Sequence, residues 1–129
     1  MFLGLRTVIY PAPNLDASKA WFTNLLGQPP YFDQPFYVGF QVAGYELALD
    51  PNAAPTSGPV TYWGVAQADR ALARLLAAGA TPDSDGVRDV GEGIRVATVG
   101  EPGGSVLGII ENPHFQLPDT AAPADGPGR

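Results

Sequence analysis

Glu46 is the residue whose type and position most clearly suggest a chemical role. It lies in the segment Tyr45-Glu-Leu-Ala-Leu-Asp50, in which apolar and polar side chains alternate as in a half-buried β-strand. A carboxylate on the polar face of such a strand could orient a ligand or accept a proton as a general base. A solvated acid on a wet sheet face is the alternative, because carboxylates are seldom buried without a partner.

A tight turn should bring Gln41 next to Glu46. The segments Tyr37–Val42 and Tyr45–Asp50 are separated by Ala43-Gly44, and a two-residue connection is typical of a β-hairpin. In the register that follows, one apolar face needs a helix to cover it, whereas Gln41 and Glu46 share the polar face. The cross-strand pairs of this register are Val42 with Tyr45, Gln41 with Glu46, and Phe40 with Leu47.

Two side chains from the second half of the chain could face the same site. Arg95 lies in an alternating segment and should point away from its apolar neighbours, so in a shared cavity it could pair with Glu46 or bind an anionic ligand group. An exposed strand arginine is the simpler interpretation. Tyr62 or Trp63 could line a pocket, although aromatic residues in strands usually belong to the core.

The composition excludes several kinds of site. The 129 residues contain no cysteine and one histidine, His114. Disulfides, thiolate metal sites and a cysteine nucleophile are therefore ruled out, and one histidine does not build a multi-histidine metal site. His114 follows Asn-Pro beside the C-terminal tail, where we expect a surface position. The glycine-rich turns match neither a dinucleotide fingerprint nor a phosphate loop.

The charge of the chain argues against polyanionic partners. Thirteen Asp and Glu residues outnumber seven Lys and Arg residues, which gives a net charge of −6 and a pI near 4.4. A nucleic-acid surface needs a basic stripe that neutralises phosphates, so we expect no nucleic-acid partner and no contact with an anionic membrane. The sequence shows neither a run of about 18 apolar residues nor a leader-like N-terminal pattern, and we expect a cytoplasmic protein.

The chain falls into two halves with the same order of elements. Each half begins with a strand, continues with a helix that stops at a glycine, and ends in paired strands. The halves also finish alike, in Leu-Asp-Pro-Asn and Ile-Glu-Asn-Pro. A duplicated unit of roughly 50 residues is therefore predicted. The expected elements are strands over 5–10, 37–42, 45–50, 60–65, 93–99 and 105–111, and helices between Asn14 and Gly27 and over 68–78, with loops at 29–36 and 81–93.

These elements predict a single domain over residues 1–115. The first module spans about 1–52, a Pro-, Ala- and Ser-rich linker about 53–59, and the second module about 60–115. Residues 116–129 consist mainly of Pro, Ala, Asp and Gly and have almost nothing to bury, so we expect this tail to be disordered.

The order of several local patterns resembles the glyoxalase/bleomycin-resistance/extradiol-dioxygenase superfamily, also called vicinal oxygen chelate. The patterns are the opening strand before Asn14-Leu15-Asp16, Trp21-Phe22 before Leu-Leu-Gly27, Ala71-Leu-Ala-Arg-Leu75 before Ala-Ala-Gly79, and Glu101-Pro-Gly-Gly before the closing strand. The resemblance covers residues 1–115. It implies an α+β fold of two βαβββ modules that form an open, curled mixed sheet with helices outside, a central cavity and commonly a homodimer.

The resemblance also bears on metal binding. In metal-dependent members of the superfamily, four inward strand positions supply His, Gln or Glu ligands, and by motif these fall on Thr7, on Glu46, near Val60 and near Gly108. Of these residues, Glu46 alone has a suitable ligand side chain. A divalent cation needs at least about two protein donors. We therefore expect no metal and no cofactor.

The sequence thus predicts a metal-free glyoxalase-like domain that binds a small organic molecule in its cavity, as resistance-type members of the superfamily do. The expected ligand-binding residues are Thr7, Gln41, Glu46, Tyr62 and Arg95. One alternative is a lyase- or isomerase-type enzyme in which Glu46 is the catalytic general base. Another is a dimeric domain without a small ligand.

Overall fold

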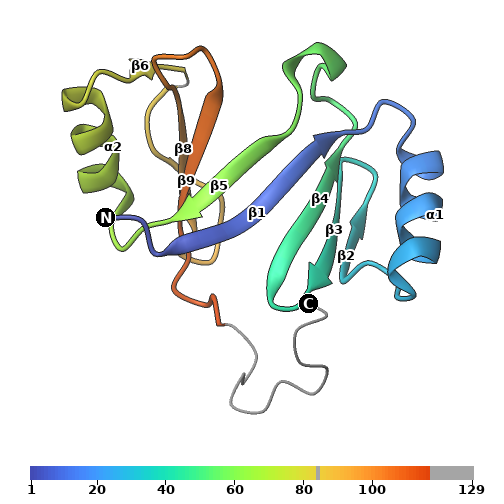
Figure 1. Cartoon of the computed structure of the whole chain (residues 1–129). Coiled ribbons are helices and arrows are strands. Elements are labelled where there is room, and N and C mark those ends of the chain that lie inside the picture. The colour runs from blue at the N-terminus through green and yellow to red at the C-terminus, as the bar shows by residue number, and fades with distance from the viewer. Residues whose placement is uncertain (84, 117–129) are drawn as a thin grey trace, which may run out of the picture.

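The computed structural model describes residues 1–83 and 85–116, and within them the chain forms one open, curled mixed sheet flanked by two helices (Figure 1). The predicted α+β architecture is confirmed. Over the described residues the sheet has nine strands in the order β2-β3-β4-β1-β5-β9-β8-β6, and β7 pairs with β8. The predicted disorder concerns residues 117–129, which lie outside the described part of the chain, and Gln116 at its end.

The two halves have matching elements and meet where β1 and β5 pair antiparallel. The first half contains β1 (Gly4–Pro11), α1 (Leu15–Leu26), β2 (Phe32–Gln34), β3 (Tyr37–Val42) and β4 (Tyr45–Asp50). A short 3-10 helix, η1 (Pro55–Ser57), lies in the connection. The second half contains β5 (Val60–Gly64), α2 (Ala68–Ala77), β6 (Thr81–Pro82), β7 (Arg88–Asp89), β8 (Arg95–Gly100) and β9 (Val106–Glu111).

Three of these strands lie in segments that the sequence predicts to be loops. The strands β2, β6 and β7 are two or three residues long and pair near the outer edges of the sheet. Such short segments carry too few residues for alternation to show in the sequence. Their pairing depends on the neighbouring strand that each one meets.

The ends of α1 follow from single residues. The Asn14 side chain accepts a hydrogen bond from the backbone N–H of Ala17 at 3.2 Å, which satisfies one of the free donors of the first turn. At the other end, Gly27 has φ 71° and its N–H donates to the Thr23 carbonyl at 3.0 Å. The predicted cap and stop of this helix are confirmed.

The predicted hairpin register is also confirmed, with Gln41 opposite Glu46. Ala43 and Gly44 both have positive φ, at 52° and 90°, as a primed two-residue turn requires. The apolar face of the hairpin packs against α1, as expected. Its cluster contains buried Ala12, Val38, Phe40 and Leu49, with Leu15, Phe22, Leu26, Val42 and Leu47 around them.

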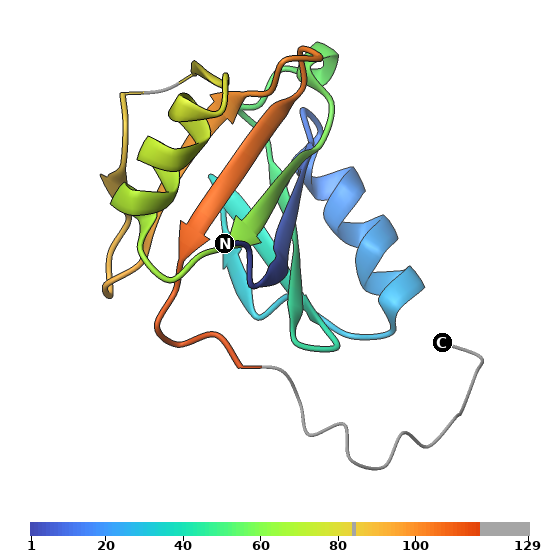
Figure 2. The ribbon, with the colours of Figure 1, turned by 60° about the vertical axis from the view of Figure 1, so that its left-hand side comes forward.

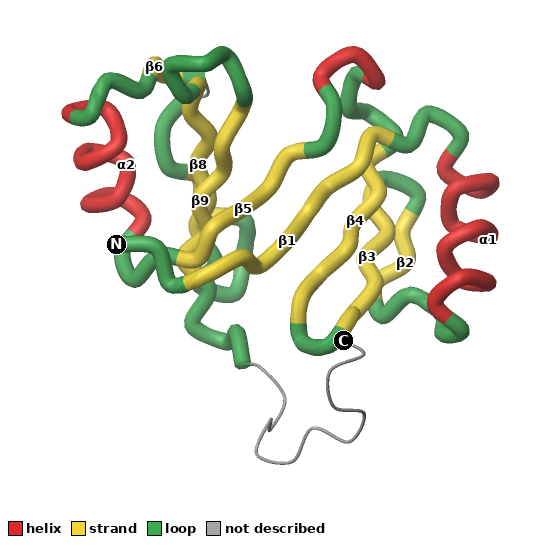
Figure 3. The backbone as a smooth tube through the Cα atoms, in the orientation of Figure 1, coloured by secondary structure: helices red, strands yellow, loops and turns green. Residues whose placement is uncertain are grey.

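Both helices pack on the same face of the sheet. A second cluster forms between α2 and the sheet and contains Val65, Ala68, Ala71, Ala97 and Ile109. Cross-strand partners share a face, and the pairs Leu47–Val8, Val8–Thr61 and Trp63–Ile109 connect the two clusters along one side. The opposite side, called the open face below, carries Thr7, Glu46 and Tyr62. Figure 3 shows α1 and α2 at the two ends of the sheet, with β1 and β5 between them.

The end of the last strand lies close to the beginning of the first. β5 runs antiparallel to β1 and parallel to β9, so the ends of β5 and β9 lie beside the start of β1 (Figure 2). The segment after β9 therefore returns toward the N-terminal strand. Within the described residues, neither helix is long and apolar enough to cross a bilayer.

Candidate functional site

The Glu46 carboxylate is held by three hydroxyl groups. Its Oε1 accepts hydrogen bonds from Thr7 Oγ1 at 3.1 Å and from the Tyr37 hydroxyl at 3.0 Å. Its Oε2 accepts a third from the Tyr31 hydroxyl. The four residues come from β1, β3, β4 and the loop before β2, and they are called the Glu46 cluster below. Hydrogen bonds to a charged acceptor are stronger than neutral ones, so this cluster fixes the carboxylate.

Strand register and one glycine make the cluster possible. The parallel pairing of β1 with β4 places Thr7 directly beside Glu46 on the open face. Gly39 on β3 leaves the necessary space, because a Cβ atom there would lie 2.6 Å from Glu46 Oε2 and 3.1 Å from the Tyr31 ring. A larger residue at this position would displace both side chains.

The two tyrosines of the cluster are neutral hydrogen-bond donors. Burial raises the pKa of the Tyr37 hydroxyl well above its ordinary value, and the neighbouring Glu46 charge raises this pKa further. Burial also raises the pKa of Tyr31, with the hydrogen bond to Glu46 as the next contribution. Both effects penalise the phenolate, so both hydroxyls keep their protons at neutral pH and continue to donate.

This hydrogen bonding restricts what Glu46 can do chemically. A carboxylate has about four acceptor positions, two on each oxygen. Two donors occupy Oε1 and one occupies Oε2. One acceptor position on Oε2 is left for a ligand. The arrangement suits a fixed anchor that accepts one hydrogen bond better than a base that must turn toward a substrate.

Three of the positions that the superfamily resemblance assigns to metal ligands, Glu46, Thr7 and Gly108, lie in one row across the open face. Thr7 pairs with Glu46 on one side and with Tyr62 on the other, and Tyr62 pairs with Gly108. Tyr62 therefore holds the β5 place in this row, whereas Val60, the residue near which the motif put the third position, pairs with Ile9. The register of the antiparallel β1–β5 pair, which is regular from Thr7 to Ile9, sets this position.

A metal ion does not fit this row. The Tyr62 ring lies over Gly108, where a Cβ atom would be 2.6 Å from the ring, so aromatic carbon occupies the fourth position. Burial raises the pKa of Tyr62, which keeps its hydroxyl neutral. In the described part of the chain, no three His, Cys, Asp or Glu side chains group closely enough to hold a metal ion. Glu46 alone supplies a carboxylate, and hydroxyls already occupy most of it.

A hollow opens where β1 and β4 separate. Their pairing begins at Thr7 and Glu46, so the preceding part of β1 has no partner on β4, and the two strands diverge there (Figure 1). The hollow has a volume of about 420 Å³. Its lining combines apolar and polar side chains from both faces of the sheet: Leu5, Arg6, Thr7, Val8, Tyr45, Glu46, Thr61 and Trp63. It is called the β1/β4 hollow below.

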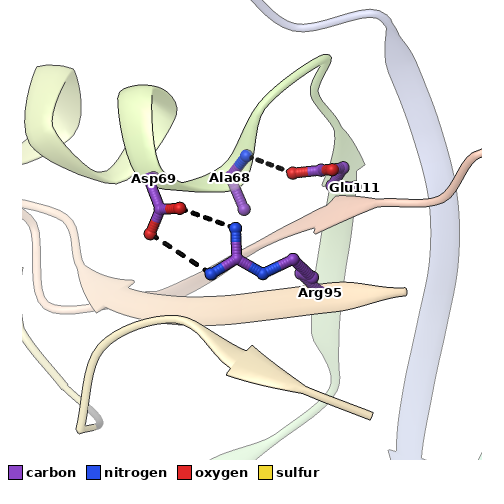
Figure 4. A network of polar contacts seen from close by, with 4 residues as sticks. All are labelled: Ala68, Asp69, Arg95 and Glu111. Carbon is purple, nitrogen blue, oxygen red and sulfur yellow. Dashed lines mark hydrogen bonds and ion pairs between the residues drawn. The ribbon is translucent and has the colours of Figure 1, made fainter. Parts of the chain in front are cut away.

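The structure places Arg95 away from the Glu46 cluster. Arg95 lies two residues before Ala97, which packs under α2, so it faces the helix and not the open face. Its Nη1 is 2.6 Å from Asp69 Oδ2, and this hydrogen bond raises the pKa of Arg95 (Figure 4). The proposed pairing with Glu46 is therefore wrong, because both faces of β8 are buried and alternation did not reveal which one α2 covers.

The residues around Arg95 fix the start of α2. Beside the ion pair, the Glu111 carboxylate at the end of β9 accepts a hydrogen bond from the Ala68 N–H at 2.8 Å (Figure 4). A negative charge on a free N–H at a helix N-terminus is stabilising. These contacts connect α2 to β8 and β9. Asp69, Arg95 and Glu111 therefore have a structural role in holding the helix on the sheet.

Gln41 and His114 make their hydrogen bonds outside the Glu46 cluster. Gln41 is opposite Glu46 in the register but exposed, and its backbone carbonyl accepts a hydrogen bond from the Gln28 side chain. The donors to Glu46 are the three hydroxyls of the cluster. His114 is exposed, as predicted, and its Nε2 lies 2.8 Å from the Glu92 carbonyl oxygen.

Three residues near the site were not recognised from the sequence. Tyr31 belongs to a proline-rich loop, and its contact with Glu46 depends on how this loop folds back. Tyr37 is the first residue of β3, and alternation puts it on the same face of the hairpin as Glu46. Arg6 lies at the bulge of β1, where regular alternation fails. The sequence held two signals for the tyrosines: the high density of aromatic residues at 31–37, and the alternation that places Tyr37 on the face of Glu46.

No protein-family model matches the chain, and no curated protein matches it. Solved structures do match. A variant of the methylmalonyl-CoA epimerase of Streptomyces coelicolor, in complex with 2-nitronate-propionyl-CoA, has a TM-score of 0.72 at 14% identity, over 92% of this chain and 100% of that one. The methylmalonyl-CoA epimerase of Mycobacterium tuberculosis has a TM-score of 0.66 at 18% identity, over 85% and 88% of the two chains.

A third match has a broader description. A glyoxalase/bleomycin resistance protein/dioxygenase superfamily member from Vibrio splendidus 12B01 has a TM-score of 0.63 at 17% identity, over 83% of this chain and 97% of that one. Likeness at such low identity establishes a shared fold, and a fold of this kind can support several chemistries.

Proposed function

We propose that this protein, which has the fold of the vicinal oxygen chelate superfamily, binds a small organic molecule in the β1/β4 hollow. The main support is the hollow itself, whose volume of about 420 Å³ is in the range of small-molecule sites. Its lining includes Thr7 and Glu46, which also belong to the hydrogen-bonded cluster. Solved structures of the same fold include an epimerase with a bound CoA derivative.

The lining suggests how such a molecule would be held. Leu5, Val8, Tyr45 and Trp63 provide apolar and aromatic walls, and burying apolar ligand surface against them is favourable by about 25 cal/mol per Å². Thr61 and Glu46, which line the hollow from the two faces of the sheet, provide polar groups that orient the molecule. A few fixed polar groups in an apolar pocket are the usual composition of a specific binding site.

The same geometry gives less support to the enzyme alternative. A general base needs a lone pair directed at the substrate, whereas three hydroxyls already occupy most of the Glu46 carboxylate. Arg95, the expected partner of Glu46 in such a mechanism, pairs with Asp69 instead. We therefore propose binding or sequestering, as in resistance-type members of the superfamily, in preference to proton transfer.

Filling the hollow should weaken the binding of a small molecule. Thr61→Trp places a large ring among the lining residues, and any small molecule identified by calorimetric screening should lose at least about tenfold in affinity. Arg70→Trp, on the exposed surface of α2, is the matched control and should leave the affinity unchanged. If the molecule binds the Thr61→Trp variant as well as it binds the unmodified protein, the hollow is not its site.

We further propose that two copies of the chain associate, as the superfamily resemblance implies. In support, α1 exposes large apolar side chains, with Trp21 60% and Leu25 61% accessible in the isolated chain. Light scattering should give twice the mass of one chain. Trp21→Glu should shift the population toward one copy, whereas a single-chain mass for the unmodified protein at micromolar concentration would contradict the dimer.

A further inference from the structure

Arg6 is a positively charged residue at the bulge of β1. It is half-buried and lines the β1/β4 hollow together with Thr7 and Glu46. The register of β1 shifts between Leu5 and Thr7, and a bulge of this kind redirects side chains away from regular alternation. As a result Arg6 lies beside Thr7 in the hollow.

The surrounding residues are shaped to accommodate the guanidinium group. A Cβ atom at Gly64 would lie 2.5 Å from Arg6 Nε, and one at Gly4 would lie 3.3 Å from Nη1. Two glycines on paired strands therefore leave the room that the group occupies. On another side, the Arg6 Cζ lies 3.7 Å from the centre of the Phe115 ring. A ring face in that position attracts the cation and restricts its motion.

No acidic side chain neutralises Arg6 among the described residues. Its Nη1 donates a hydrogen bond to the Leu5 carbonyl at 3.1 Å, and the ion pairs within the described residues are Lys19 with Asp33 and Arg95 with Asp69. Acids outnumber bases by 13 to 7 in the sequence, so carboxylates are abundant. A guanidinium that remains without one has donors to offer to an incoming anion.

We propose that Arg6 makes the hollow selective for an anionic ligand, a small molecule with a carboxylate or phosphate group attached to an apolar body. This inference rests on the proposed binding function of the hollow. The anionic group binds the guanidinium, and the apolar body lies against Leu5 and Trp63. A hydroxyl or amide donor on the ligand would complete the contacts at Glu46, which repels a second anionic group at that end.

Isosteric probes separate charge recognition from simple burial. Phenylacetate and phenylacetamide have nearly the same size and shape, and phenyl phosphate offers a second anionic group. Each is titrated by NMR against the unmodified protein, following the indole N–H of Trp63 in the hollow. Phenylacetate or phenyl phosphate should bind at least about tenfold more tightly than phenylacetamide. This preference should shrink as sodium chloride is added, because salt screens the charge.

Arg6 variants then test the assignment. Arg6→Gln should remove the preference for the anion while leaving phenylacetamide affinity unchanged, and Arg6→Lys should retain part of it. Arg70→Gln, an exposed arginine on α2, is the control and should change nothing. Equal losses for anion and amide in Arg6→Gln would show a packing role on Phe115 and overturn the inference. Absence of a preference in the unmodified protein would overturn it as well.

A different result would contradict the proposed function: Thr61→Trp leaves the binding of all three probes unchanged. If phenylacetamide binds and Thr61→Trp blocks it, the hollow is a binding site whatever the result for the anions. If both anionic probes bind more tightly than the amide but Thr61→Trp does not affect them, Arg6 recognises anions outside the hollow, and the assignment to this site is wrong.

Discussion

Replacing Glu46 by alanine should lower the free energy of unfolding by about 1–3 kcal/mol. The change removes the acceptor shared by Thr7, Tyr31 and Tyr37. Thr7 is 8% exposed and Tyr37 is half-buried, so their hydroxyls would lose a charged acceptor with little access to water. Tyr31 is 57% exposed and can bond to solvent instead. Urea denaturation followed by circular dichroism measures the change.

Two further variants separate the roles of this carboxylate. Asp85→Ala removes an exposed acid and should change stability by less than about 0.5 kcal/mol. Glu46→Gln keeps one acceptor oxygen, so its cost should be smaller than that of alanine. If a substrate is ever found, retention of turnover in Glu46→Gln excludes this residue as the base. A Glu46→Ala protein as stable as the original would contradict the anchoring role of the cluster.

Replacing Phe40 by alanine should have the largest effect on stability, a loss of about 3–5 kcal/mol. Phe40 is 0% exposed and lies in the cluster under α1 with Val38 and Leu49. Its ring centre is 6.3 Å from that of Phe22 on the helix. The substitution leaves a cavity between the hairpin and α1 and weakens the scaffold that positions Glu46 on the other face.

The matched control is Phe36→Ala, in the loop just before β3. Phe36 is 59% exposed and contacts the Phe32 ring, whose centre is 6.1 Å away. Its loss should cost less than about 1 kcal/mol. Chemical denaturation of both variants, with the slope of the transition compared, measures the difference. Similar costs for Phe40→Ala and Phe36→Ala would mean that the hairpin face under α1 has been misassigned.

Local sequence patterns were sufficient for the parts of the fold that local chemistry determines. Alternation over residues 37–50 gave both the register and the face that α1 covers, because a two-residue turn permits few alternatives. Asn14 and Gly27 marked the ends of α1 for reasons of capping and backbone conformation. In each case one or two residues are enough to determine the local backbone structure.

The site was harder to predict because its contacts join distant segments. Glu46 was recognised, and Thr7 was placed beside it through the superfamily motif, but Tyr31, which completes the cluster together with Tyr37 of β3, comes from a loop whose path no local period describes. Arg95 was assigned to the wrong face because β8 is apolar on both sides. Arg6 was overlooked because a bulge changed its direction.

A crystal structure of the protein grown with phenylacetate or phenylacetamide is the most direct measurement of the proposed binding function. We expect electron density for the probe in the β1/β4 hollow, in contact with Thr61 and Trp63 and close to the Glu46 cluster. The density should disappear in Thr61→Trp crystals grown in the same way. A probe bound elsewhere, for example along the outer surface of α1, with the hollow empty, would contradict the proposal.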